Sequence, residues 1–202
     1  QLAAVYLVSF RFALAKGTLT EDETRKLAAT LLEMPSFVEN MLSCDKAIEP
    51  ISNKLKKTKS LFFIGRGLDY ALSCEGSIKL KEVSYIHSEA YAAGELKHGT
   101  ISLITDNVPV IALATQENVF AKMISNIREV RSRGAKVIMV AGTGAQVDAS
   151  LCDHLITLPP VNDLFAPFGA AIVLQYIAYY TATARGLNVD QPRNLAKSVT
   201  VE

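Results

Sequence analysis

Short apolar runs alternate with longer amphipathic segments from residue 60 onward. Four of these runs are mainly apolar and do not alternate with polar residues, at 61–65, 109–114, 136–142 and 154–159. Continuous apolar runs are typical of strands in a parallel sheet that is covered on both faces. A fifth strand is expected near 88–92, and the intervening segments predict helices at 68–86, 119–133 and 166–185. The pattern therefore predicts an α/β fold, a three-layer αβα sandwich with a doubly wound, mainly parallel sheet.

The first part of the chain has a helical pattern of a different kind. Residues 1–16 are apolar on nearly every side, which predicts a helix buried among other elements. Such a helix needs neighbours, so we interpret residues 1–45 as the last helices of a truncated preceding domain. The sandwich is then expected at residues 46–190, followed by a tail at 191–202 without a helical or strand period.

Local signals predict where the next helices begin and end. A helix is expected to start at Thr20, because Glu23 three residues later completes a capping box. It should end before Pro35, since proline breaks a helix interior. The following helix is expected to run from residue 36 toward residue 55, with a kink at Pro50.

The helix predicted at 68–86 carries charges in an unusual place. At about 100° per residue, its apolar arc contains the residues Leu68, Ala71, Leu72, Cys74, Ile78, Val83, Tyr85 and Ile86. Glu75, Lys79 and Glu82, which are spaced four and three residues apart, fall in the middle of that arc. The opposite arc is polar, with Ser73, Ser77, Lys81 and Ser84. The three charges are therefore expected to face inward.

Two interpretations of this charged trio remain open. In the first, the acidic, basic and acidic side chains form a buried row, and burial of this kind shifts pKa values for proton transfer. Alternatively, the three side chains form ordinary ion pairs on a solvated stripe. His98, flanked by Gly94 and Gly99 in a turn, adds a group that titrates near neutrality, although a lone loop histidine is more often a plain surface residue.

Two glycine pairs follow predicted strands, Gly65-Arg66-Gly67 and Gly142-Thr143-Gly144. In doubly wound folds, ligands bind at this edge of the sheet. Neither pair has the third glycine of a dinucleotide fingerprint. We therefore interpret both as plain turns between strand and helix.

Composition limits the function classes. The net charge of +1 comes from scattered acids and bases, which gives no basic stripe for nucleic acid. The cysteines, Cys44, Cys74 and Cys152, are odd in number and well separated, which favours a reducing compartment such as the cytoplasm and argues against a metal site. The apolar start of the chain spans about a dozen residues and contains Arg11, too short for a membrane helix.

Two long motifs then suggest a family. EGSIKLKEVSYIHSEAYAAGELKHG at 75–99 and DQPRNLAKSVTVE at 190–202 together resemble the sugar-isomerase (SIS) half of the glutamine–fructose-6-phosphate aminotransferases. The resemblance implies the SIS fold and conversion of fructose 6-phosphate, with ammonia from glutamine, into glucosamine 6-phosphate, a step of hexosamine biosynthesis. It implies no metal or redox cofactor. The implied partners are a second copy of the chain in a homodimer, a glutaminase domain and a first SIS subdomain.

The resemblance also implies residue roles. Glu82 corresponds to the base that moves a proton between sugar carbons 1 and 2, and Lys79 and Glu75 correspond to its supporting ladder. His98 corresponds to the ring-opening residue, supplied to the neighbouring subunit's site. Lys197, with Ala196 beside it, corresponds to the tail lysine that binds the open-chain sugar as an imine; a lysine amine can attack a carbonyl in this way.

The same resemblance sets an expectation about this chain alone. The Ser/Thr-rich loops that hold the sugar phosphate, and the glutaminase with its cysteine nucleophile, do not occur in the 202 residues. Catalysis by the isolated chain is therefore not expected. Two other functions stay open: a non-catalytic SIS module that binds a sugar phosphate and regulates a partner, or a segment that serves folding and dimerisation.

Overall fold

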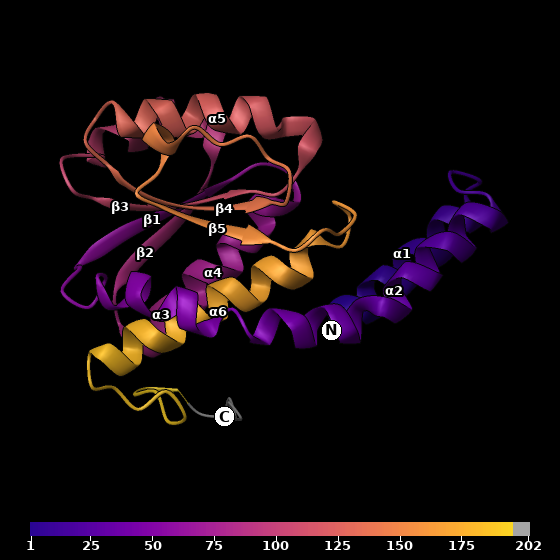
Figure 1. Cartoon of the computed structure of the whole chain (residues 1–202), viewed down its shortest axis with the longest axis horizontal. Helices are drawn as coiled ribbons and strands as arrows, with labels where there is room; N and C mark the ends of the chain where they lie inside the picture. Colours follow the sequence, from indigo (N-terminus) through magenta and orange to yellow (C-terminus); the bar gives the residue numbers. More distant parts are fainter. Residues whose placement is uncertain (196–202) are drawn as a thin grey trace, which may run out of the picture. The chain divides into compact units, whose positions relative to one another are not determined.

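The computed structural model describes residues 1–195 of the chain (Figure 1). The chain divides into two compact units, Gln1–Ser43 and the part from Cys44 onward. Among residues 1–195, no helix combines the length and the apolar character that crossing a membrane requires.

The first unit is a pair of helices, α1 (Leu2–Ala15) and α2 (Glu21–Leu42). The capping box is confirmed, since the Thr20 hydroxyl accepts the Glu23 N–H at 3.2 Å and the Glu23 carboxylate accepts the Thr20 N–H at 2.8 Å. The predicted break at Pro35 is wrong, because α2 continues through it. The buried residues Leu31, Met34 and Met41 lie along the helix on both sides of the proline, so the apolar pattern that supports the helix is not interrupted.

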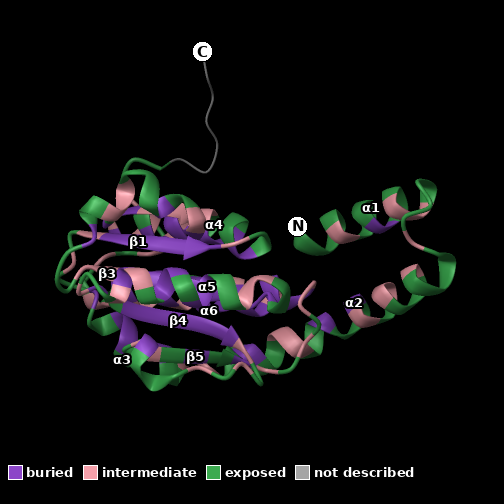
Figure 2. Ribbon diagram, turned by 90° about the horizontal axis from the view of Figure 1, so that it is seen from above, coloured by how far each residue is buried: buried purple, intermediate pink, exposed green. Residues whose placement is uncertain are grey.

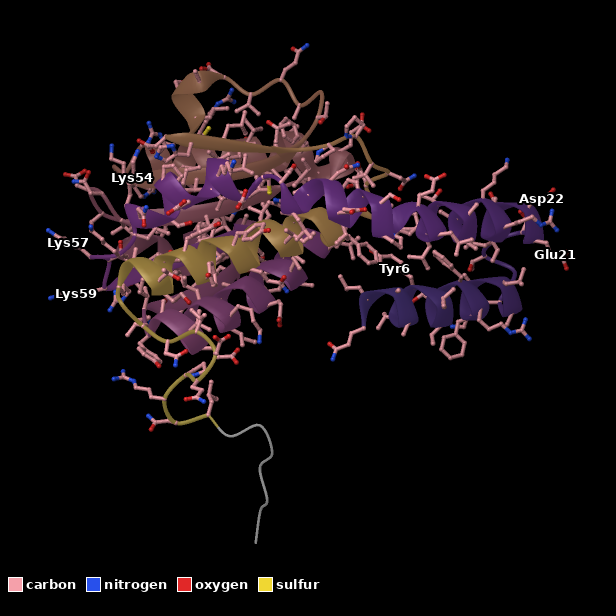
Figure 3. The ribbon with its side chains drawn as sticks, turned by 60° about the horizontal axis from the view of Figure 1, so that its bottom comes forward. Tyr6, Glu21, Asp22, Lys54, Lys57 and Lys59 are labelled. Carbon is pink, nitrogen blue, oxygen red and sulfur yellow. The ribbon has the colours of Figure 1, made fainter. Side chains whose placement is uncertain are left out.

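Helix α1 does not have the burial that its composition predicted. Only Phe10 is buried, while large apolar side chains are exposed, among them Val5, Leu7 and Phe12 (Figure 2). The ring of Tyr6 lies between the two helices and 6.0 Å from that of Phe10 (Figure 3). Within the first unit, α1 therefore leaves most of its apolar surface uncovered.

The second unit contains the predicted sandwich. Its sheet has five parallel strands in the order β2-β1-β3-β4-β5. The strands are β1 (Ser60–Gly65), β2 (His87–Ala92), β3 (Pro109–Ala114), β4 (Lys136–Gly142) and β5 (His154–Leu158). The order reverses between β1 and β3, which confirms a doubly wound sheet.

Helices cover both faces of this sheet. They are α3 (Asp45–Asn53), α4 (Leu68–Ser84), α5 (Glu117–Arg131) and α6 (Ala166–Ala184), with single 3₁₀ turns at Ala93–His98, Thr100–Leu103 and Ala149–Leu151. Helices α3, α4 and α6 pack together on one face and α5 lies on the other (Figure 1). Helix α3 starts at Asp45 and contains Pro50, so the helix predicted from residue 36 to residue 55 is in fact shared between α2 and α3.

Candidate functional site

Helix α4 is turned the opposite way from the sequence prediction. Its serine side faces the sheet, with Ser73, Ser77 and Ser84 buried, while Ile78 from the apolar arc is 50% exposed. The expectation that Glu75, Lys79 and Glu82 face inward is therefore wrong for this chain.

Small side chains explain this orientation. The hydroxyls of Ser73 and Ser84 donate to the carbonyls of Asp69 and Leu80, four residues earlier, at 2.7 and 2.6 Å, so their burial leaves no unpaired polar atom. Ser77 donates to the Ser88 carbonyl in β2 at 2.9 Å. Serine and glycine let the helix approach the sheet closely, and their hydroxyls cost little once they are bonded.

The charged trio forms one linked group on the outer side of α4. Lys79 Nζ lies 2.6 Å from Glu82 Oε2 and 4.0 Å from Glu75 Oε1. The side chains of Glu82, Lys79 and Glu75 are 32%, 36% and 54% exposed. The hydrogen bond to Glu82 is the main cause that raises the pKa of Lys79, opposed by partial burial. Lys79 therefore stays a cation beside Glu82 at neutral pH.

A pocket of about 600 Å³ adjoins the carboxyl end of α4. Its lining comes from two distant parts of the chain: Ile78, Lys81, Glu82, Tyr85, Ile86 and His87, and then Arg193, Asn194 and Leu195. The predicted base Glu82 is thus the member of the trio that borders a cavity. One side of this pocket is lined by residues 193–195 of the terminal motif that contains Lys197.

Two residues of this pocket were not identified from the sequence. Tyr85 ends α4, and its hydroxyl accepts the N–H of Arg193 at 2.8 Å. The guanidinium carbon of Arg193 lies 4.1 Å from the centre of the Tyr85 ring. Both residues lie inside the two long motifs, but nothing in their local pattern indicates that they meet.

His98 lies at the other end of β2 from Glu82. The strand begins at His87, just past the end of α4, and the 3₁₀ turn that carries His98 follows its carboxyl end. Six residues of strand span about 20 Å. His98 is 65% exposed, with Nε2 3.8 Å from Glu95 Oε2. The structure therefore does not bring His98 and Glu82 together within one chain.

The remaining predicted residues, Ala196 and Lys197, lie outside the described residues. Their neighbour Leu195 is described and borders the pocket. Among residues 1–195, no group of three His, Cys, Asp or Glu side chains is arranged to hold a metal ion.

At the edge of the sheet where doubly wound folds bind ligands, the start of α4 is hydrogen-bonded to the residue that follows β3. Asp69 is buried, and its carboxylate accepts the N–H and the hydroxyl of Thr115 at 2.7 and 2.6 Å. Burial raises the pKa of Asp69, and the Thr115 hydrogen bonds oppose this effect. A Cβ at Gly65 would lie 2.5 Å from the Asp69 backbone, so glycine is needed for close packing there. This geometry favours the plain-turn interpretation of Gly65-Arg66-Gly67.

A second pocket of about 410 Å³ lies beside the amino ends of β3, β4 and β5. Lys54 Nζ and His154 Nε2 are 3.0 Å apart at its margin. Burial lowers the pKa of His154, and the Lys54 charge adds to this effect. Lys57 and Lys59 from the same basic run extend away from the ribbon (Figure 3). Of the predicted catalytic residues that the structure describes, Glu75, Lys79, Glu82 and His98, none lines this pocket.

Comparison with known proteins agrees with this architecture. The family model described as the SIS domain matches residues 54–185. The glutamine–fructose-6-phosphate aminotransferase (isomerizing) of Clostridium tetani is 49% identical over 202 residues, which make up 100% of this chain and 33% of that protein. The enzyme of the same name from Methanosarcina acetivorans is 43% identical with the same coverage. The chain thus spans about a third of the length of the curated relatives it matches.

Solved structures show the same fold. The C-terminal domain of glucosamine-fructose-6-phosphate aminotransferase from Francisella tularensis superposes with a TM-score of 0.88 and 34% identity, covering 93% of this chain and 53% of that one. A putative phosphosugar isomerase from Bacillus subtilis has a TM-score of 0.76 at 20% identity, covering 94% of this chain and 56% of that one, and shows the fold alone. Because the family model covers well over half of the residues and the sandwich is present, this chain belongs to the SIS domain family.

Proposed function

We propose that this chain is the second SIS subdomain and tail of an enzyme that makes glucosamine 6-phosphate from fructose 6-phosphate and glutamine-derived ammonia. The observation that carries the proposal is the position of Glu82. This carboxylate borders the 600 Å³ pocket, is paired with a cationic lysine, and faces the segment that leads into the tail motif. The names of the relatives supply the substrate class.

The chemistry divides between the tail and α4. The neutral amine of Lys197 attacks the C2 carbonyl of the open-chain sugar and forms an imine with loss of water. Ammonia then displaces the lysine, so the sugar carries the new nitrogen at C2. Glu82 removes a proton from C1 and returns it to C2, while the proton of the C1 hydroxyl passes to the imine nitrogen, which gives the 2-amino aldose.

Lys79 has an electrostatic role in this scheme. Its pKa is raised, chiefly by the hydrogen bond to Glu82, so it keeps its positive charge. A fixed cation holds the Glu82 carboxylate in one position and disfavours a second positive charge nearby. Glu75, at 4.0 Å from the ammonium, helps to orient Lys79 from the other side.

His98 is assigned to sugar ring opening in the site of a neighbouring subunit. Its exposure, and its position at the far end of β2 from Glu82, support a role outside its own chain's pocket. This assignment requires a homodimer. The exposed apolar residues of α1 support the proposal that residues 1–45 belong to a first SIS subdomain, followed by the second at 46–190 and the tail at 191–202.

The remaining parts of the enzyme follow from the same proposal. The first SIS subdomain supplies the loops that hold the sugar phosphate, and a glutaminase domain supplies ammonia. The three cysteines are free, which supports a cytoplasmic setting. The isolated 202-residue chain is therefore expected to be inactive.

Borohydride trapping tests the function. The full-length protein is incubated with fructose 6-phosphate and borohydride, and the labelled lysine is mapped by mass spectrometry. We expect a reduced sugar adduct at Lys197, with glucosamine 6-phosphate formed when glutamine is present. Lys81, another lysine at the pocket, is the internal control and should remain unlabelled.

Two results would change the assignment. Labelling at Lys79 with Lys197 unmodified would contradict the roles given to the two lysines. Binding of fructose 6-phosphate without adduct or product would favour the non-catalytic sugar-phosphate module.

A further inference from the structure

Tyr85 has a backbone conformation that its side chain disfavours. It ends α4 with φ 59° and ψ 18°, in the left-handed region, and its N–H donates to the Lys81 carbonyl at 3.1 Å. Glycine and asparagine adopt this conformation readily, whereas an aromatic residue meets steric resistance there. An outlier of this kind persists only where surrounding contacts hold it, and it often marks a functional site.

Contacts from a distant segment hold Tyr85 in this conformation. The phenol oxygen accepts the Arg193 N–H at 2.8 Å, and the Arg193 guanidinium lies over the ring at 4.1 Å. A backbone hydrogen bond combined with a cation–π contact fixes both the position and the direction of the chain at Arg193. The two residues are 108 positions apart, so this contact is a tertiary one.

The segment held in this way borders the proposed base. Arg193, Asn194 and Leu195 share the 600 Å³ pocket with Glu82, which lies three residues before Tyr85 on α4. The contact with Tyr85 thus holds residues 193–195, which line one side of the pocket, next to the helix that carries Glu82. Asn194 also has a positive φ, 62°, so the chain turns sharply there.

We propose that Tyr85 is a positioning residue for the isomerase reaction. Its left-handed turn presents the phenol ring to Arg193. The hydrogen bond and the cation–π contact between Tyr85 and Arg193, together called the latch, fix residues 193–195 beside Glu82. The inference rests on the proposed function, because its consequence is correct placement of the tail lysine and the base around one sugar. Neither Tyr85 nor Arg193 reacts with the substrate in this scheme.

Tyr85→Gly is the most informative variant, in the full-length protein. Glycine suits the left-handed conformation, so the fold should be kept while the latch is lost. We expect the rate of borohydride labelling at Lys197 with fructose 6-phosphate, and kcat for glucosamine 6-phosphate formation, to fall about 10- to 100-fold. The melting temperature and glutamine hydrolysis should stay close to wild type.

Conservative variants separate positioning from packing. Tyr85→Phe keeps the ring but loses the hydrogen bond, and should lower labelling less than Tyr85→Gly. Arg193→Lys keeps a cation over the ring and should exceed Arg193→Met in labelling rate. Tyr179→Phe, at an exposed tyrosine of α6, is the matched control and should behave as wild type.

The outcomes are distinguishable. Wild-type labelling and kcat in Tyr85→Gly would overturn the latch while leaving the proposed function intact. If Tyr85→Gly lowers the melting temperature, Tyr85→Phe becomes the test of the latch. Unchanged labelling of Lys197 in Tyr85→Phe would then overturn the latch. A wild-type enzyme that neither labels at Lys197 nor forms product would instead contradict the proposed function.

Discussion

The two sides of α4 use polar residues in opposite ways. On the sheet side, Ser77 is buried and its hydroxyl bonds to the neighbouring strand. On the outer side, Lys79 and Glu82 form a 2.6 Å ion pair that keeps about a third of each side chain exposed. Hydroxyls can be buried cheaply once they are bonded, whereas ions lose hydration even when paired. The small hydroxyl side chains of α4 therefore lie against the core, and the charged trio lies on the outer side, where Glu82 borders the pocket.

This contrast bears on how a proton-transfer group is held. A carboxylate that borders a pocket can act as a base, and a neighbouring ammonium fixes its position. The serine side supplies the rigid support, because it ties α4 to β2 through the Ser77 and Ser88 hydrogen bonds at 2.9 and 3.0 Å. Changes on the outer side should thus affect turnover, and changes on the inner side should affect folding.

The largest effect is expected for Glu82→Gln in the full-length enzyme. Loss of a positioned general base typically lowers the rate about 10²- to 10⁴-fold. Glucosamine 6-phosphate formation should fall by that factor while glutamine hydrolysis is unchanged. Both activities are measured in the same preparation.

Glu129→Gln is the matched control for Glu82→Gln. Glu129 also lies on a helix, is 30% exposed and has Arg133 at 3.9 Å. This variant should keep both activities. Equal loss of the two activities in Glu82→Gln would show a folding defect and would break the contrast between the two sides of α4.

Gly76→Val tests the inner side. A Cβ at Gly76 would lie 2.8 Å from Leu174 Cδ1 and 3.2 Å from Phe63 Cε1, both buried. Overpacking of this kind costs about 1–3 kcal/mol of unfolding free energy. Urea unfolding of the 202-residue chain measures it.

Gly76→Ala should be nearly neutral by the same measurement. The gain in helix propensity, about 1 kcal/mol, offsets the milder steric conflict with the Leu174 side chain. A valine variant as stable as wild type would show that α4 and α6 can move apart, and that the serine side is not tightly packed.

Among the variants expected to change stability, Lys79→Met should have the smallest effect. The ion pair with Glu82 is partly exposed, so its loss should lower the unfolding free energy by less than about 1 kcal/mol. Because the pKa of Lys79 is raised in the fold, its contribution is present below the unfolded lysine pKa of about 10.4 and is lost as pH rises through the folded pKa.

Unfolding of wild type and Lys79→Met at several pH values measures this contribution. The difference between them should be constant from about pH 7 to pH 9 and shrink above about pH 10.4. A difference that already shrinks between about pH 7 and pH 9 would contradict a raised lysine pKa.

Sequence patterns determined the sandwich and the contacts among the three charged residues of α4. Nearly continuous apolar runs such as 109–114 and 137–142 identified parallel strands, because strands covered on both faces do not alternate between apolar and polar residues. The spacing of Glu75, Lys79 and Glu82 showed that they meet, since residues three and four apart share a helix face. Both signals are local, so no knowledge of distant contacts was needed.

Tertiary structure alone decided the orientation of α4 and which distant segment lines its pocket. A helical period shows which residues share a face, but the packing partners decide which face is buried. Here the sheet and α6 come close to Gly76 and Ser77 because those residues are small. The contact between Tyr85 and Arg193 joins segments 108 residues apart, and only the folded sandwich brings the end of α4 next to the tail.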